Sequence, residues 1–216
     1  MVSNNGHQSY STFECLLSHV WKIVTQVRGL DPEETSQVRI SVNGRPRISE
    51  PAVNMEYFGN LVLWAYPRLE VRELLNESYA DIARVIHHEV NRVNNRYFKS
   101  FIDFGATIDQ EGGNGNKTDE LQQTTPEFGS TLCPDLEVDS WLRFRFHDID
   151  FGGGSPCRVI PPNSPFEGLV VFIPAGAEDG GVDVKLTLFA EHVPLFKKIA
   201  HSIDSNIYPS KIGIYE

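Results

Sequence analysis

The sequence LEVDSWLRFRF, residues 136–146, leads into the pentapeptide DFGGG at residues 150–154. The first run mixes apolar and polar side chains as a strand does, and an acid, an aromatic and three glycines follow it. Glycine costs conformational order in a strand or helix, so three in succession predict unusual backbone dihedral angles or close contact with a bulky neighbour. The junction therefore predicts a strand that ends in a tight turn.

The composition is that of a soluble globular protein. Of the 216 residues, 40% are hydrophobic and 22% are charged, and this length suits one domain or at most two. The formal net charge of −10 disfavours a nucleic-acid backbone or an anionic membrane as partner. No apolar run is long enough for a transmembrane helix, and the first residues lack the pattern of a secretory signal. We expect a cytoplasmic protein that binds neither nucleic acid nor membrane.

The common catalytic and metal-binding motifs are absent. DFG is also the magnesium motif of protein kinases, but no glycine-rich ATP loop, VAIK strand or HRD loop accompanies it. The sequence has no GxSxG and no HExxH, and its three widely spaced cysteines form no CxxC. We therefore expect neither a bound metal nor a disulfide framework. His147 lies close to the glycines and is a candidate base, although a structurally bonded histidine is the more frequent case.

A helix is predicted from Thr12 to Arg28. Ser11 and Glu14 form the capping-box pattern, in which each side chain accepts a hydrogen bond from the other residue's backbone amide. Apolar residues then recur at helical spacing up to Gly29, a residue typical of a helix C-cap.

Two strands are predicted in the next stretch. Gln37 to Val42 alternates as a strand does, and Asn43-Gly44 after it is a strong turn signal. Arg45 and Arg47 follow two residues apart, so an extended backbone would point both to the same side. The continuous apolar run from Leu61 to Tyr66 predicts a buried central strand.

The remaining chain predicts a mixture of helices and strands. Ser78 to Phe104 keeps one apolar face, as expected of a single helix of about 40 Å. Residues 109–128 are rich in Gly, Asn, Gln and Thr and predict a flexible loop. A buried strand at 168–174, an alternating strand at 182–188 and a helix at 191–203 complete the order. The expected fold class is α/β.

The opening junction resembles the SWxR…DFGWG region of the plant BAHD acyltransferases, with Gly153 where that motif has tryptophan. Further segments are similar to the family in the same order: YSTFE at 10–14 with HVW at 19–21, NGRPR at 43–47 with YFGN at 57–60, CPDLEVDSW at 133–141 and FAEH at 189–192. The subgroup most resembled is the hydroxycinnamoyl-CoA amine N-acyltransferases that act on agmatine and tryptamine. The resemblance implies a chloramphenicol-acetyltransferase-like domain, a mixed β-sheet with flanking helices that forms one of the two halves of the BAHD fold.

The resemblance also implies an incomplete catalytic site. The family's base is the histidine of HxxxD, and none of the seven histidines here has aspartate four residues later. We therefore expect residues 1–216 to be a single C-terminal-type domain that holds no catalytic residue and is inactive alone. The implied reaction is acyl transfer from acyl-CoA, as co-substrate and without a bound cofactor, to a small amine or hydroxyl acceptor, with a separate N-terminal half as partner. The alternative is a truncated, non-catalytic protein that binds a ligand or partner.

Site residues follow from motif positions. The resemblance implies that Asp150, Phe151, Gly152 and Gly154 form a structural motif, in which Asp150 pairs with an arginine of the Arg45/Arg47 segment, with Arg47 the preferred partner. Such a pair suits the charge-assisted geometry of a guanidinium.

Three further residues have implied roles in binding. Ser11 and Thr12 lie where the family approaches CoA, although a capping role explains both residues equally well. Arg143 lies where relatives that use shikimate bind the acceptor carboxylate.

Overall fold

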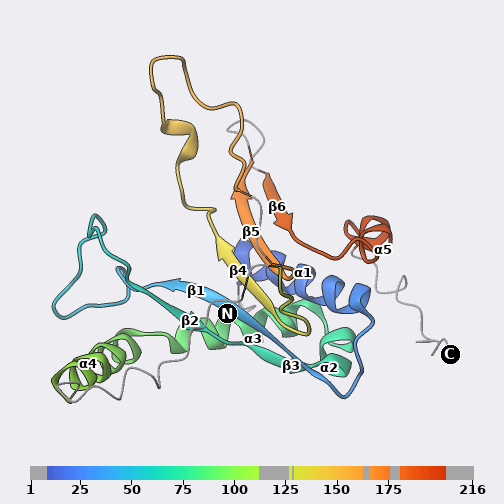
Figure 1. Cartoon of the computed structure of the whole chain (residues 1–216), viewed down its shortest axis with the longest axis horizontal. Helices are drawn as coiled ribbons and strands as arrows, with labels where there is room; N and C mark the ends of the chain where they lie inside the picture. Colours follow the sequence, from blue (N-terminus) through green and yellow to red (C-terminus); the bar gives the residue numbers. More distant parts are fainter. Residues whose placement is uncertain (1–8, 112–126, 128, 163–165, 176–180, 203–216) are drawn as a thin grey trace, which may run out of the picture.

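The computed structural model describes residues 9–111, 127, 129–162, 166–175 and 181–202. A mixed sheet in the order β2-β1-β4-β5-β6 forms its centre, with β3 also paired to β1 (Figure 1). The β1–β4 and β4–β5 pairs are parallel and the others are antiparallel. The strands are β1 (Thr35–Asn43), β2 (Val62–Ala65), β3 (Arg68–Glu70), β4 (Leu136–Ser140), β5 (Leu169–Pro174) and β6 (Val182–Leu186). The helices are α1 (Thr12–Arg28), α2 (Val71–Asn76), α3 (Tyr79–Arg92), α4 (Asn95–Glu111), the 3-10 turn η3 (Phe146–Asp148) and α5 (Val193–Ile199).

The core lies between one face of this sheet and the helices α1 and α3. Alternate residues of β1 are buried, and Val38 and Ile40 pack in one cluster with Trp21 of α1 and Ile86 of α3. The indole of Trp21 donates a hydrogen bond to Ser36 Oγ (2.9 Å), which joins α1 to the start of β1. Burying this face removes apolar surface from water and is the main source of the fold's stability.

Helix α1 confirms the predicted caps. The Ser11 side chain accepts from the Glu14 amide, the Glu14 side chain accepts from the Ser11 amide, and Gly29 ends the helix at φ 60°. β5 and β6 confirm the two strands predicted at 168–174 and 182–188 and pair antiparallel, and α5 confirms a shorter form of the last helix.

The long helix predicted from Ser78 to Phe104 was wrong in its continuity, because α3 ends at Arg92 and α4 begins at Asn95. The side chain of Asn94 accepts a hydrogen bond from the Tyr97 amide (3.2 Å), as an N-cap residue does, so the chain starts a second helix there. Helix α4 then runs outward from the sheet (Figure 1).

Three other boundaries differ from the predictions. β2 stands at the end of the strand order and only its alternate residues are buried, so it is not a central strand. β4 ends at Ser140, and the chain turns back at Trp141, whose carbonyl accepts from the Phe144 amide (2.9 Å). Of the predicted loop 109–128, residues 109–111 belong to α4, whereas 112–126 and 128 lie outside the described residues.

The segment between β4 and β5 forms an arm that extends beyond the sheet and carries the 150–154 turn (Figure 1). Lys185 of β6 donates to the carbonyls of Pro161 (3.1 Å) and Pro162, which ties the returning side of this arm to the sheet. Within the described ranges, no helix is long and apolar enough to cross a lipid bilayer.

Candidate functional site

Asp150 holds its own glycine turn together. Its Oδ1 accepts hydrogen bonds from the backbone amides of Gly152 (2.7 Å) and Gly154 (2.9 Å). Both glycines have a left-handed φ, 96° and 95°, which a residue with a side chain rarely adopts. The Gly152 amide, and then that of Gly154, lower the pKa of Asp150, because they stabilise the charged carboxylate. The two amides of the turn thus bind the Asp150 carboxylate, and the Phe151 side chain beside it is 97% exposed.

Arg47 lies at the end of α3 and not at the glycine turn. Its Nη1 donates to the carbonyl oxygens of Val90 (2.9 Å) and Val93 (3.0 Å). Carbonyls at the end of a helix lack partners within the helix, so the guanidinium caps them. This corrects the predicted pairing of Arg47 with Asp150: the carboxylate bonds to amides of its own turn, and the arginine bonds to carbonyls of another element.

Arg45 binds the loop that precedes β2. Its Nη2 donates to the carbonyls of Tyr57 (2.9 Å) and Gly59 (2.6 Å). The amide of Arg47 donates to the carbonyl of Gly44 (2.9 Å), so the chain turns between the two arginines. The prediction that both arginines point to the same side was therefore wrong, because it assumed an extended backbone.

Arg143 is exposed and lies on the arm shortly after β4. Burial is the main reason that the pKa of Arg47 is lowered, and the positive charge of Arg143 adds to this effect. The charge of Arg143 is therefore close enough to act on the guanidinium of Arg47. The acceptor-binding role of Arg143 stays a prediction.

The predicted CoA-contacting residues begin α1. Ser11 Oγ donates to Glu14 Oε2 (2.8 Å), so its hydroxyl is engaged in the capping box, whereas Thr12 after it is exposed. Glu14 Oε1 in turn lies 2.7 Å from His87 Nδ1 of α3. Burial would raise the pKa of Glu14, but the hydrogen bonds from Ser11 and His87 outweigh it and lower that pKa. The start of α1 is therefore fixed to α3 by a polar chain.

A polar row on the other face of the sheet was missed by the sequence analysis. Arg39 of β1 forms an ion pair with Glu137 of β4, and its guanidinium lies 4.6 Å from the ring centroid of Trp64 on β2. Next to them, Ser41 Oγ donates to Asp139 Oδ1 (2.7 Å). Burial raises the pKa of Glu137, while Arg39 opposes that rise. The sequence does carry a signal for this row, because Arg39 and Ser41 in β1, and Glu137 and Asp139 in β4, alternate with apolar residues.

The histidine beside the glycine turn makes a structural contact. His147 Nδ1 lies 3.3 Å from the carbonyl oxygen of Pro156 within the same arm. In the part of the chain that the structure describes, no three His, Cys, Asp or Glu side chains are grouped to hold a metal ion.

Comparison with known proteins identifies relatives along nearly the whole chain. The model of the Transferase family matches residues 2–202. The chain is 53% identical over 194 residues to tryptamine hydroxycinnamoyltransferase 2 of Oryza sativa subsp. japonica, covering 90% of this chain and 43% of that protein. It is 40% identical over 196 residues to agmatine coumaroyltransferase-1 of Hordeum vulgare, with 90% and 43% covered. The chain therefore spans less than half the length of these relatives.

Solved structures share the fold. The structure of F. sporotrichioides TRI101 complexed with coenzyme A and T-2 matches with a TM-score of 0.72 at 22% identity, covering 91% of this chain and 43% of that one. Vinorine synthase matches with a TM-score of 0.63 at 17% identity, covering 88% and 41%. These matches confirm the predicted fold class of a mixed sheet with flanking helices. With the family model spanning residues 2–202, the chain belongs to the Transferase family, which includes the plant BAHD acyltransferases.

Proposed function

We propose that this chain is the C-terminal part of a CoA-dependent acyltransferase that transfers a hydroxycinnamoyl-type acyl group to an amine. The observation that carries the proposal is the 53% identity over 194 residues to a rice enzyme named for tryptamine and hydroxycinnamoyl transfer. Coenzyme A in the structure of TRI101, which has the same fold, supports acyl-CoA as the co-substrate.

The proposed reaction joins the amine nitrogen to the thioester carbonyl carbon and breaks the carbon–sulfur bond, so that CoA leaves as the thiol. The amine must lose a proton, and a positioned base contributes about 10²–10⁴-fold to such a step. No histidine of this sequence begins an HxxxD motif. We therefore assign the base to a separate N-terminal half, and to this chain the binding of substrates and the shape of the site.

Two features of this chain suit a binding role. The exposed guanidinium of Arg143 would attract an anionic group of acyl-CoA. At the start of α1, Thr12 is available for CoA, while the Ser11 hydroxyl would have to leave Glu14 to take part.

The second candidate is a non-catalytic protein that binds a ligand or partner. The absence of HxxxD favours it, because the chain then has no family base of its own. The two candidates differ in whether this chain can complete an active enzyme.

A chimera tests the proposal directly. This chain would replace the matching 43% of rice tryptamine hydroxycinnamoyltransferase 2. The assay measures the CoA thiol released from p-coumaroyl-CoA when tryptamine is the acceptor. It is run on the chimera and on the isolated chain. We expect turnover by the chimera, none by the isolated chain, and none by a chimera whose HxxxD histidine is changed to alanine. A folded chimera without turnover would refute the proposed function.

A further inference from the structure

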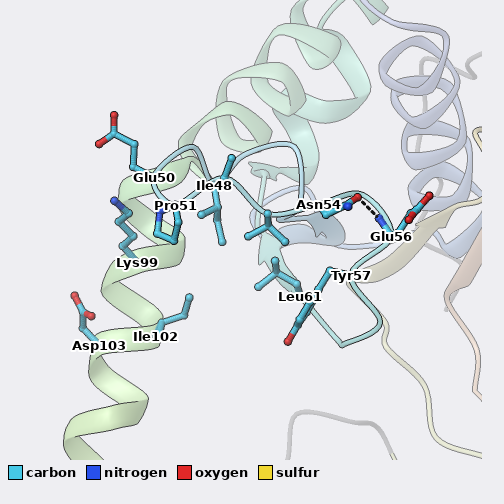
Figure 2. A pocket seen from close by; sticks show the side chains of 12 residues that line it. Ile48, Glu50, Pro51, Asn54, Glu56, Tyr57, Leu61, Lys99, Ile102 and Asp103 are labelled. Atoms are coloured by element: carbon cyan, nitrogen blue, oxygen red, sulfur yellow. Dashed lines mark hydrogen bonds between the residues drawn. The ribbon is translucent and has the colours of Figure 1, made fainter.

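A cavity lies between α4 and the loop that joins β1 to β2 (Figure 2). Its volume of ≈ 870 Å³ is in the range of small-molecule sites, about 300–1,000 Å³. Its apolar lining comes from both sides, with Ile48, Pro51, Val53 and Leu61 on the loop and Ile102 on α4. The cavity can therefore hold the hydrocarbon or aryl body of a ligand.

The charges around this cavity are predominantly negative. Glu50, Glu56 and Asp103 contribute three carboxylates to its lining, and Lys99 contributes one ammonium group. Figure 2 shows Glu50, Lys99 and Asp103 along the α4 side, and Glu56 on the opposite side close to Tyr57. The lining carries an excess of negative charge, which favours a cationic ligand and disfavours an anionic one.

Hydrogen bonds hold the loop side of the cavity in place. The side chain of Asn95 on α4 accepts from the Ser49 amide (3.3 Å), which joins the loop to the helix. The side chain of Asn54 accepts from the Glu56 amide (2.9 Å) in a local turn. A Cβ at Gly59 would lie 2.5 Å from the Tyr57 ring, so glycine is needed for the ring to occupy this place. The site is thus formed before a ligand arrives, which reduces the entropic cost of binding.

We propose that this cavity binds an organic ammonium ion with an apolar body. The apolar lining would bury the body, and the carboxylates would attract the ammonium group. The amine class is the same as that of the proposed acceptor. The inference rests on the shape and charge of the cavity alone, and it requires no acyl transfer.

Calorimetric titration of the full chain with tryptamine, without acyl-CoA, tests the proposal. We expect saturable binding, and binding at least about fivefold weaker for uncharged 3-ethylindole and for anionic indole-3-propionate, since each lacks the charge-assisted contact. Asp103→Asn and Glu56→Gln should each weaken tryptamine binding by about two- to fivefold, and Lys99→Gln should strengthen it by a similar factor. Asp183→Asn, on β6, is the matched control and should leave binding unchanged.

Equal affinity for tryptamine and 3-ethylindole would overturn the proposal, because the cavity would then be an apolar docking surface. Absence of saturable tryptamine binding, with the far-ultraviolet circular dichroism of a folded chain, would also overturn it. Glu56, Asp103 and Asp183 are exposed and Lys99 is half-buried, so loss of folding is not expected. Turnover of the chimera is measured separately, so failure of either proposal leaves the other standing.

Discussion

Asp150 and Arg47 stabilise different parts of the molecule. The carboxylate bonds to two amides within four residues of itself, and it is exposed, so its influence ends at the glycine turn. The half-buried guanidinium of Arg47 bonds to Val90 and Val93, near the point where α3 gives way to α4. An arginine that satisfies helix-end carbonyls holds two elements in place, whereas an acid that closes one turn holds only that turn.

Removing each of these side chains should separate the two roles. Arg47→Ala should destabilise the chain by about 1–2 kcal/mol, or roughly 3–6 °C in Tm, because two carbonyls lose their donor. Asp150→Ala should leave the Tm within experimental error, since only an exposed turn loses its acceptor. Thermal unfolding followed by circular dichroism measures both, with Arg145→Ala as an exposed arginine control. A large loss of Tm for Asp150→Ala would instead favour a pairing between Asp150 and the body of the protein.

Arg28 and Glu167 form a buried ion pair with a much larger expected effect. Their side chains are 1% and 3% exposed, and Arg28 Nη1 also donates to the carbonyls of Pro134 (3.1 Å) and Asp135 (3.0 Å). Arg28→Met should cost about 3–5 kcal/mol in urea unfolding, because it leaves the charge of Glu167 buried without an opposite charge, with only the Thr131 hydroxyl still donating to it. Arg72→Met removes a 53% exposed side chain with two ion pairs and should cost less than about 1 kcal/mol. Similar losses of unfolding free energy for Arg28→Met and Arg72→Met would contradict the view that burial makes the Arg28–Glu167 pair the more important one.

At the scale of elements, the sequence predicted what depends on neighbours along the chain. The capping box and Gly29 bound α1, and the apolar run at 169–174 gave β5, because both signals lie within the element itself. The break at Asn94 was missed because the apolar face continues past it, and only the cap and the carbonyl contacts of Arg47 reveal it. The surroundings of the candidate site were less predictable, because Arg39 and Glu137 lie 98 positions apart and meet only when β1 and β4 pair.

The start of α1 should make stability depend on acidic pH. The pKa of Glu14 is lowered in the folded chain, so its carboxylate stabilises the fold above the unfolded pKa of about 4.3, and this contribution is lost as pH falls through the folded pKa. Glu14→Gln keeps an acceptor for Ser11 but cannot titrate, so it should be less stable by about 0.5–1 kcal/mol at pH 7. Urea unfolding from pH 7 to pH 3 should show that difference shrinking.

The matched control for this pH dependence is Glu191→Gln, whose side chain is 78% exposed. The difference in unfolding free energy between Glu191→Gln and the unchanged chain should stay constant from pH 7 to pH 3. A difference for Glu14→Gln that is constant with pH would show that the capping box, and not the charge, accounts for its effect.

At the scale of the whole molecule, the described sheet has two different faces. Helices α1 and α3 bury one face in the apolar core, while the other face carries the row of Arg39, Glu137 and Asp139. Helix α4 and the arm extend away from this layered centre (Figure 1). The chain spans 43% of its rice relative, and under the proposed function we expect these extensions to contact the rest of the acyltransferase.

Helix α4 should therefore make the isolated chain associate with itself. Tyr97, Phe101 and Phe104 share one face of this helix at spacings of four and three residues and are between 44% and 57% exposed, and apolar surface of this kind normally contacts a partner. Sedimentation velocity should show mass that rises with protein concentration, and Phe101→Ser with Phe104→Ser should shift the chain toward monomer at unchanged Tm. Leu195→Ser, a 43% exposed residue on α5, is the control and should leave association intact. A monomer at all concentrations would contradict the expectation, whereas a partner segment that suppresses association and binds α4 would identify what normally covers this helix.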